Sequence, residues 1–134
     1  MTIPNADSIA ATLTDLQATI HGMNELKGFH EDRPTDPTNL AQWQGNKLLL
    51  IVSEVVEAHD EIRNGRAADE TYYATIPEQH PFAPFKPEGV PSEIADVVIR
   101  CFDFAGTEGF DLGNIILEKL RFNSGRPYRH GKAF

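Results

Sequence analysis

The chain has 134 residues, of which 40% are hydrophobic and 24% charged, values typical of one soluble globular domain spanning residues 1–134. Its net charge of −8 and isoelectric point near 5.0 argue against a nucleic-acid groove or a membrane-surface binder, both of which are normally basic. A single cysteine, Cys101, excludes an internal disulfide. No apolar run can span a bilayer and no export signal opens the chain, so we expect a cytoplasmic protein.

The first predicted helix begins near Asp7 and Ser8, either of which can cap it, and ends around Lys27–Gly28. Its apolar residues recur at alternating steps of four and three, at Ile9, Leu13, Leu16, Ile20 and Met23. A polar loop over residues 28–36 separates it from the next helix.

The second predicted helix starts with Asp36 as its cap and Pro37 at its first position, and ends near Asn64–Gly65. At about 100° per residue, one apolar stripe forms its expected core face: Leu48, Ile51, Val55 and Ile62. The adjoining sector carries acidic residues, which should therefore border the core rather than face solvent: Glu54, Glu57 and Glu61.

Residues 66–91 differ in kind, because a proline recurs every three or four residues from Pro77 to Pro91. Such density prevents a continuous helix. Four aromatic residues lie in the same segment, at Tyr72, Tyr73, Phe82 and Phe85, and they favour a lid or an oligomer contact over simple disorder. No β-type alternation is visible anywhere, so we expect an all-α fold with this long loop inserted between its second and third helices.

The third predicted helix runs from Pro91–Ser92 to about Ala105–Gly106. Its core stripe comprises Ile94, Val97, Val98, Cys101 and Ala105, and the sector beside it carries Glu93, Asp96, Arg100 and Asp103. The fourth is capped by Asp111 and closes near Ser124–Gly125. It should bury Leu112, Ile115, Ile116 and Leu120, and present Lys119, Asn123 and Arg126 along one edge.

Two acidic pairs, Glu54/Glu57 and Glu93/Asp96, share i, i+3 spacing, which places both members of a pair on one helix surface. Four carboxylates gathered in a small fold repel one another without a cation, and they supply the oxygen ligands that Mg²⁺ prefers. The alternative is that all four face solvent and pair with Lys and Arg. A di-iron bundle would need Glu-x-x-His motifs. Neither pair has a histidine three residues on, and His59 falls outside the acidic sector.

The charge of the chain is uneven. The last 16 residues contain no acid, and their basic side chains are Lys119, Arg121, Arg126, Arg129, His130 and Lys132. An acidic middle followed by a basic tail over residues 125–134 suits a site that holds a metal and a phosphate, although a solvated basic tail would give the same pattern.

The chain resembles the MazG-like branch of the all-α nucleoside triphosphate pyrophosphohydrolases. That family has E-x-x-E on one helix, E-x-x-D on the next, a Lys and an Asn on the fourth helix, and an Arg-rich ending. The matching segments are residues 47–57, 86–100, 109–112 and 119–132. The gap between Glu57 and Glu93 is longer than in the compact members of the family.

The resemblance implies a four-helix MazG-like bundle that uses Mg²⁺, with Mn²⁺ as a substitute, to hydrolyse a nucleoside triphosphate between its α and β phosphates. It implies the metal ligands Glu54, Glu57, Glu93 and Asp96, with Glu61 as a further ligand or a water-orienting base. For substrate binding it implies Lys119, Asn123, Arg126, Arg100 and Lys132. It also implies a homodimer or homotetramer.

A base pocket is predicted from two further residues. Trp43, about three turns before Glu54, can stack on a base, and His30 can assist from the preceding loop. Packing in the core or an interface remains the alternative for Trp43, and solvent exposure for His30. Two other functions remain open for the chain: a phosphoribosyl-ATP pyrophosphohydrolase, and a catalytically silent helical module that binds a nucleotide or a partner protein.

Overall fold

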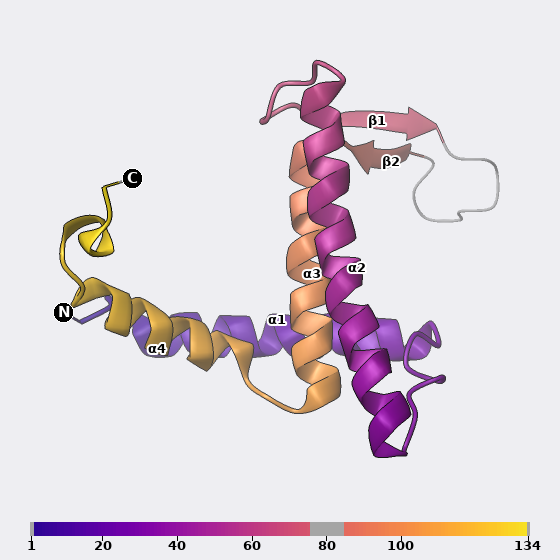
Figure 1. The fold of residues 1–134 in the computed structure, drawn as a ribbon, viewed down its shortest axis with the longest axis horizontal. Coiled ribbons are helices and arrows are strands. Elements are labelled where there is room, and N and C mark those ends of the chain that lie inside the picture. The colour runs from indigo at the N-terminus through magenta and orange to yellow at the C-terminus, as the bar shows by residue number, and fades with distance from the viewer. Residues whose placement is uncertain (1, 76–84, 134) are drawn as a thin grey trace. The chain divides into compact units, whose positions relative to one another are not determined.

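The structure is a computed structural model that describes residues 2–75 and 85–133 (Figure 1). It is mostly helical, with helices α1 (Ala6–Leu26), α2 (Pro37–Arg63), α3 (Val90–Glu108) and α4 (Leu112–Ser124), and a short 3₁₀ helix η1 (Tyr128–Gly131). Strands β1 (Tyr72–Thr75) and β2 (Phe85–Glu88) form an antiparallel pair. None of the helices in the described part of the chain is long and apolar enough to cross a membrane. The predicted helical fold is confirmed, whereas the expectation that the chain contains no strand is wrong.

The chain forms two compact units whose boundary falls within α3. Unit 1 comprises Met1–Glu31 and Phe102–Phe134, and unit 2 comprises Asp32–Cys101. The acids of the two predicted pairs all belong to unit 2, whereas the predicted phosphate-binding residues of α4 and the basic tail belong to unit 1.

Two of the three predicted helix caps are confirmed. The side chain of Asp36 accepts a hydrogen bond from the backbone N–H of Asn39 at 3.0 Å, and Asp111 caps α4 in the same way. These bonds favour the ionised carboxylate and lower the pKa of both aspartates. The predicted cap of α1 is wrong, because Asp7 and Ser8 already lie inside the helix. Asn5 precedes it in a left-handed conformation (φ 57°) without a side-chain cap bond.

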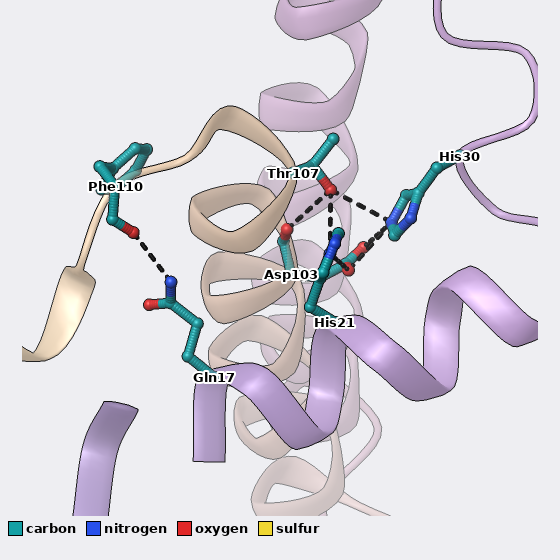
Figure 2. A network of polar contacts seen from close by, with 6 residues as sticks. All are labelled: Gln17, His21, His30, Asp103, Thr107 and Phe110. Carbon is teal, nitrogen blue, oxygen red and sulfur yellow. Dashed lines mark hydrogen bonds and ion pairs between the residues drawn. The ribbon is translucent and has the colours of Figure 1, made fainter. Parts of the chain in front are cut away.

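In unit 1, α1 and α4 lie side by side and antiparallel (Figure 1). Gly113 permits this close approach, since a Cβ atom there would lie 2.7 Å from the Cβ of Leu13. Gln17 fixes the connection between α3 and α4: its side chain donates to the carbonyl of Phe110 at 2.8 Å (Figure 2) and accepts from the N–H of Leu112 at 3.1 Å.

In unit 2, α2 lies antiparallel beside the first part of α3 (Figure 1). The buried residues of α2 are Trp43, Glu54 and Ala58. The predicted core stripe of α2 is not the buried face: Leu48, Val55 and Ile62 are 46–49% exposed. At 100° per residue Glu54 and Ala58 lie in the sector that adjoins this stripe, so the buried face of α2 is the neighbouring one.

The same correction applies to part of the core predicted on the other helices. Residues expected to be buried are instead exposed at Ile94, Val98, Ile115 and Leu120, and the apolar residues Ile9, Leu16 and Met23 of α1 are exposed as well. The hydrophobic residues that are buried are Trp43, Ala58, Phe102, Ala105 and Leu117. Periodicity therefore identified apolar faces but did not show which of them pack within a single chain.

The hairpin occupies both ends of the segment expected to be a loop. Its register pairs Tyr72 with Glu88 and Thr75 with Phe85. Residues 76–84, which include the middle of the predicted lid, lie outside the described residues. The hydroxyl of Tyr72 donates to Glu61 Oε1 at 3.0 Å and so ties β1 to α2. This bond to an acceptor is the main cause of the raised pKa of Tyr72.

Candidate metal centre

Three of the four predicted metal ligands meet in unit 2. Carboxylate oxygens of Glu54 on α2 and of Glu93 and Asp96 on α3 all lie within 4.8 Å of one another. Glu54 and Glu93 are each only 7% exposed. Buried carboxylates are rare unless something compensates their charge. The prediction that acids of α2 and α3 border the interior of the fold is therefore confirmed for Glu54 and Glu93. It is wrong for Glu57, which is exposed.

The start of α3 is set by the hairpin that precedes it. Gly89, between β2 and α3, has a φ of 107°, and a Cβ there would overlap the backbone carbonyl oxygen of Glu70. Its own carbonyl accepts from the N–H of Glu93 at 3.1 Å, and the hydroxyl of Ser92 donates to the carbonyl of Pro87 at 2.9 Å. These contacts fix the first turn of α3, the turn that carries Glu93.

The electrostatics show the crowding of the acids. The pKa of Glu93 is raised from 4.5 to about 7, first because burial penalises its charge and second because of the negative charge of Glu57. Hydrogen bonding with Glu57 and Glu54 adds to the shift. The pKa of Asp96 is raised as well, by burial and then by the charge of Glu54. A cation among these oxygens would relieve the repulsion.

Glu57 and Glu61, which the sequence placed in the same site, are not among the three acids that converge. Glu57 is exposed and lies outside the set of three, although its charge acts on Glu93. Glu61 accepts the hydrogen bond of Tyr72. The role of Glu57 as a fourth ligand and that of Glu61 as a ligand or base stay predictions.

Two cations offset part of the negative charge. Arg100, which the resemblance assigned to the substrate, donates from Nε to Glu54 Oε1 at 2.5 Å. Lys86 on β2 pairs with Glu88 at 2.8 Å, and its charge, like that of Arg100, offsets part of the rise in the pKa of Asp96. Lys86 was not predicted as a site residue, because a lysine in a proline-rich segment gives no sign that a hairpin will bring it near α3.

The donor set fits a hard divalent cation. All three groups offer carboxylate oxygens, the ligands that Mg²⁺ and Mn²⁺ share, and imidazole or thiolate ligands are absent from this set. Cys101 lies five residues after Asp96 on α3, and burial raises the pKa of its thiol, which suits packing rather than nucleophilic attack.

The remaining predicted binding residues belong to unit 1, whereas the three acids belong to unit 2. Lys119, Asn123, Arg126 and Lys132 are exposed residues of unit 1. The ammonium of Lys119 lies 5.4 Å from the ring of Phe122, so at present it contacts its own helix. Their contact with a phosphate or a sugar stays a prediction.

The two predicted base-pocket residues are both engaged within the protein. The ring of Trp43 is buried, donates from Nε1 to Asp32 at 3.1 Å, and has the ammonium of Lys47 4.8 Å from its centroid. His30 contacts Asp103 in unit 1. The environment of Trp43 matches the packing alternative, and the stacking role stays a prediction.

The candidate metal centre thus consists of the carboxylates of Glu54, Glu93 and Asp96. The charges of Arg100 and Lys86 act on them. The assignment of a metal centre depends on this arrangement and on the spacing of the acids in the sequence. No family model, curated protein or solved structure matches this chain.

Proposed function

We propose that this chain is a Mg²⁺-dependent nucleoside triphosphate pyrophosphohydrolase of the MazG-like kind, which releases a nucleoside monophosphate and pyrophosphate. The observation that carries the proposal is the convergence of Glu54, Glu93 and Asp96 within 4.8 Å. Such a set is unfavourable by itself, as the raised pKa of Glu93 demonstrates, and becomes favourable when a divalent cation binds.

In this proposal the acids bind the cation and the basic residues bind the substrate or position the acids. Glu54, Glu93 and Asp96 would hold the cation, and Glu57 would join them as the fourth ligand. When bound, the cation supplies positive charge beside the phosphate oxygens on which negative charge develops. Arg100 positions the carboxylate of Glu54 through its short hydrogen bond. Lys119, Asn123, Arg126 and Lys132 would bind the phosphates or the sugar.

A panel of canonical and modified ribo- and deoxyribonucleoside triphosphates, incubated with the protein and Mg²⁺, tests the proposal by release of pyrophosphate. We expect Glu57→Gln and Asp96→Asn each to lower turnover by about a hundredfold or more, because a metal-held phosphoryl transition state depends on those charges. Asp60→Asn is the matched control, since Asp60 is an exposed acid of α2 that pairs with Arg63 at 3.5 Å.

The outcomes separate the proposal from its alternatives. Near-full activity in both site variants would show that the acids are wrongly assigned. Pyrophosphate released from phosphoribosyl-ATP alone would favour the histidine-synthesis enzyme. Nucleotide binding without release of pyrophosphate from any triphosphate would favour the silent binding module.

We also propose a homo-oligomer, either a dimer or a tetramer. The support is exposed apolar surface on α2, where Leu48, Val55 and Ile62 of the stripe and the neighbouring Val52 and Val56 are all 46–54% exposed. Contiguous exposed apolar surface of this kind commonly marks a protein–protein interface. A second copy of this chain offers the same stripe, which suits an isologous contact.

A further inference from the structure

Unit 1 contains a second cluster of potential ligands, which the proposed function does not use. His21 on α1, His30 in the loop after α1, and Asp103 and Thr107 on α3 converge, as Figure 2 shows. His30 Nε2 lies 3.0 Å from both carboxylate oxygens of Asp103, and His21 Nδ1 lies 3.4 Å from Oδ1. The side chains of His21, His30 and Asp103 are 27%, 12% and 16% exposed.

Local backbone features make room for this cluster. A Cβ atom at Gly106 would lie 2.7 Å from Cβ and Cγ of His21 and 3.0 Å from its Nδ1, so only glycine lets the imidazole lie this close to α3. Gly28, with a φ of 80°, ends α1 and turns the chain, which allows His30 to return to the same place. Asp103 and Thr107 are one turn apart and share a face of α3.

The groups that face the two imidazoles are oxygen atoms with free lone pairs. Thr107 donates its hydroxyl hydrogen to the carbonyl of Asp103 at 2.9 Å. Its oxygen therefore acts as an acceptor toward His21 Nδ1 at 3.4 Å and His30 Nε2 at 3.2 Å. Together with the Asp103 carboxylate, this arrangement of oxygen and nitrogen lone pairs suits a metal ion at the centre of the cluster.

We propose that His21, His30 and Asp103 form a binding site for a divalent first-row transition-metal ion, with Zn²⁺ the best fit. Two imidazoles and one carboxylate are a common set of three zinc ligands, with a fourth position left for water or another oxygen. Bonds of about 2.0–2.1 Å to a tetrahedral ion place neighbouring ligand atoms about 3.3 Å apart. The His–Asp separations of 3.0 and 3.4 Å match that spacing.

Binding requires one adjustment. The two rings are stacked, with centroids 4.8 Å apart and planes 19° apart. One imidazole must rotate about its Cβ–Cγ bond so that both nitrogen lone pairs point to the same ion. The ion then joins α1, the following loop and α3 within unit 1. The imidazole nitrogens exclude Mg²⁺ as the preferred ion, so this site and the carboxylate cluster select different metals, and neither proposal depends on the other.

The test uses the full chain, treated with a chelator and then titrated with Zn²⁺ against a chromophoric competitor in excess Mg²⁺. A Glu93→Gln background keeps zinc from the carboxylate cluster. We expect one Zn²⁺ per chain, and a loss of at least about a hundredfold in affinity in His21→Ala and in His30→Ala, since even outer-shell changes cost up to that much. His130→Ala, which removes an exposed histidine of η1, is the matched control and should bind as tightly as its parent.

Two measurements keep the test decisive if an alanine variant fails to fold. Asp103→Asn keeps the size of the side chain and should still weaken binding. In the unchanged protein, the imidazole nitrogen resonances of His21 Nδ1 and His30 Nε2 should shift on addition of zinc, while those of His130 stay unchanged. The proposal is overturned if zinc does not bind, if it binds equally to the His21 and His30 variants, or if other histidines shift instead.

Discussion

Glu93 is the residue whose burial and negative charge conflict most directly in the metal-free fold. It is 7% exposed and lies among acids that raise its pKa to about 7. Relative to its ordinary pKa of 4.5, and at about 1.4 kcal/mol per pKa unit, ionising it in the folded protein costs roughly 3 kcal/mol. A buried acid with this cost is typical of a functional site, because packing alone would be better served by an apolar side chain.

A pH titration of stability tests this view of Glu93. Because the folded protein binds its proton more tightly than the unfolded chain does, the free energy of unfolding of the metal-free protein should fall as pH rises from about 4.5 to about 7, and level off above that. Glu93→Gln should flatten this slope and make the metal-free variant more stable than its parent at pH 8, by about 1–3 kcal/mol. Urea denaturation monitored by circular dichroism across the pH range measures both effects.

The same stability measurements, repeated with Mg²⁺, test whether Glu93 binds the metal. Millimolar Mg²⁺ should stabilise the parent protein at pH 8, since it binds only the folded state, and should have little effect on Glu93→Gln. Asp60→Asn, an exposed acid of the same helix pair, should keep the parent's slope and its response to Mg²⁺. A Glu93→Gln variant less stable than the parent at pH 8 without metal would contradict the assigned crowding.

The sequence predicted which acids converge better than it predicted which cations lie near them. The i, i+3 spacing of acids beside an apolar stripe was enough to foresee that Glu54, Glu93 and Asp96 meet. It was not enough to foresee Lys86, or the pairing of Arg100 with Glu54. Helical spacing fixes neighbours along one element, whereas contacts between elements depend on packing that a single sequence does not encode locally.

At the scale of elements, the short hairpin sets the position of α3. Gly89 links the two, with a φ of 107° and no room for a Cβ beside the carbonyl oxygen of Glu70. The sequence predicted the end of α2 from Asn64–Gly65 and the start of α4 from Asp111, because caps and glycines carry local signals. It missed β1 and β2, because four-residue strands within a proline-rich segment are stabilised by each other and by the bond from Tyr72 to Glu61.

Gly89→Ala should therefore be more harmful than an ordinary glycine substitution. Gly65→Ala is the matched control, since Gly65 also has a positive φ, 88°, but a Cβ there meets nothing within 4 Å. The control should lose about 1–2 kcal/mol through backbone strain. Gly89→Ala should lose a further 1–3 kcal/mol or so, because the carbonyl of Glu70 belongs to the backbone and cannot move aside cheaply.

Chemical denaturation of both variants measures the difference, and amide exchange locates it. Faster exchange in Gly89→Ala should concentrate in the strands and the first turn of α3, near Glu93. Equal losses of stability in the two variants would show that the Glu70 contact does not constrain the start of α3.

At the scale of the molecule, the buried and apolar faces of α2 are not the same face. Glu54 and Ala58 are buried, while Leu48, Val55 and Ile62 of the neighbouring apolar stripe are about half exposed. The sequence-based expectation assigned that stripe to the core of one chain. Hydrophobic periodicity reports only that a face is to be buried, and it does not distinguish burial inside a chain from burial against a second copy.

Val52→Glu tests the second possibility. Val52 is 54% exposed and lies beside the stripe, one turn from Leu48 and Val55, so a glutamate there should cost a lone chain little. In an oligomer held through this surface it would bury an unpaired charge at a cost of several kcal/mol. Light scattering coupled to size-exclusion chromatography should give the mass of a dimer or tetramer for the parent and a monomer for Val52→Glu. Asn46→Glu, which adds the same charge to an exposed position of α2 outside the stripe, should keep the parent's mass. A monomeric parent, or a Val52→Glu variant that assembles as the parent does, would show that the stripe does not hold copies of this chain together.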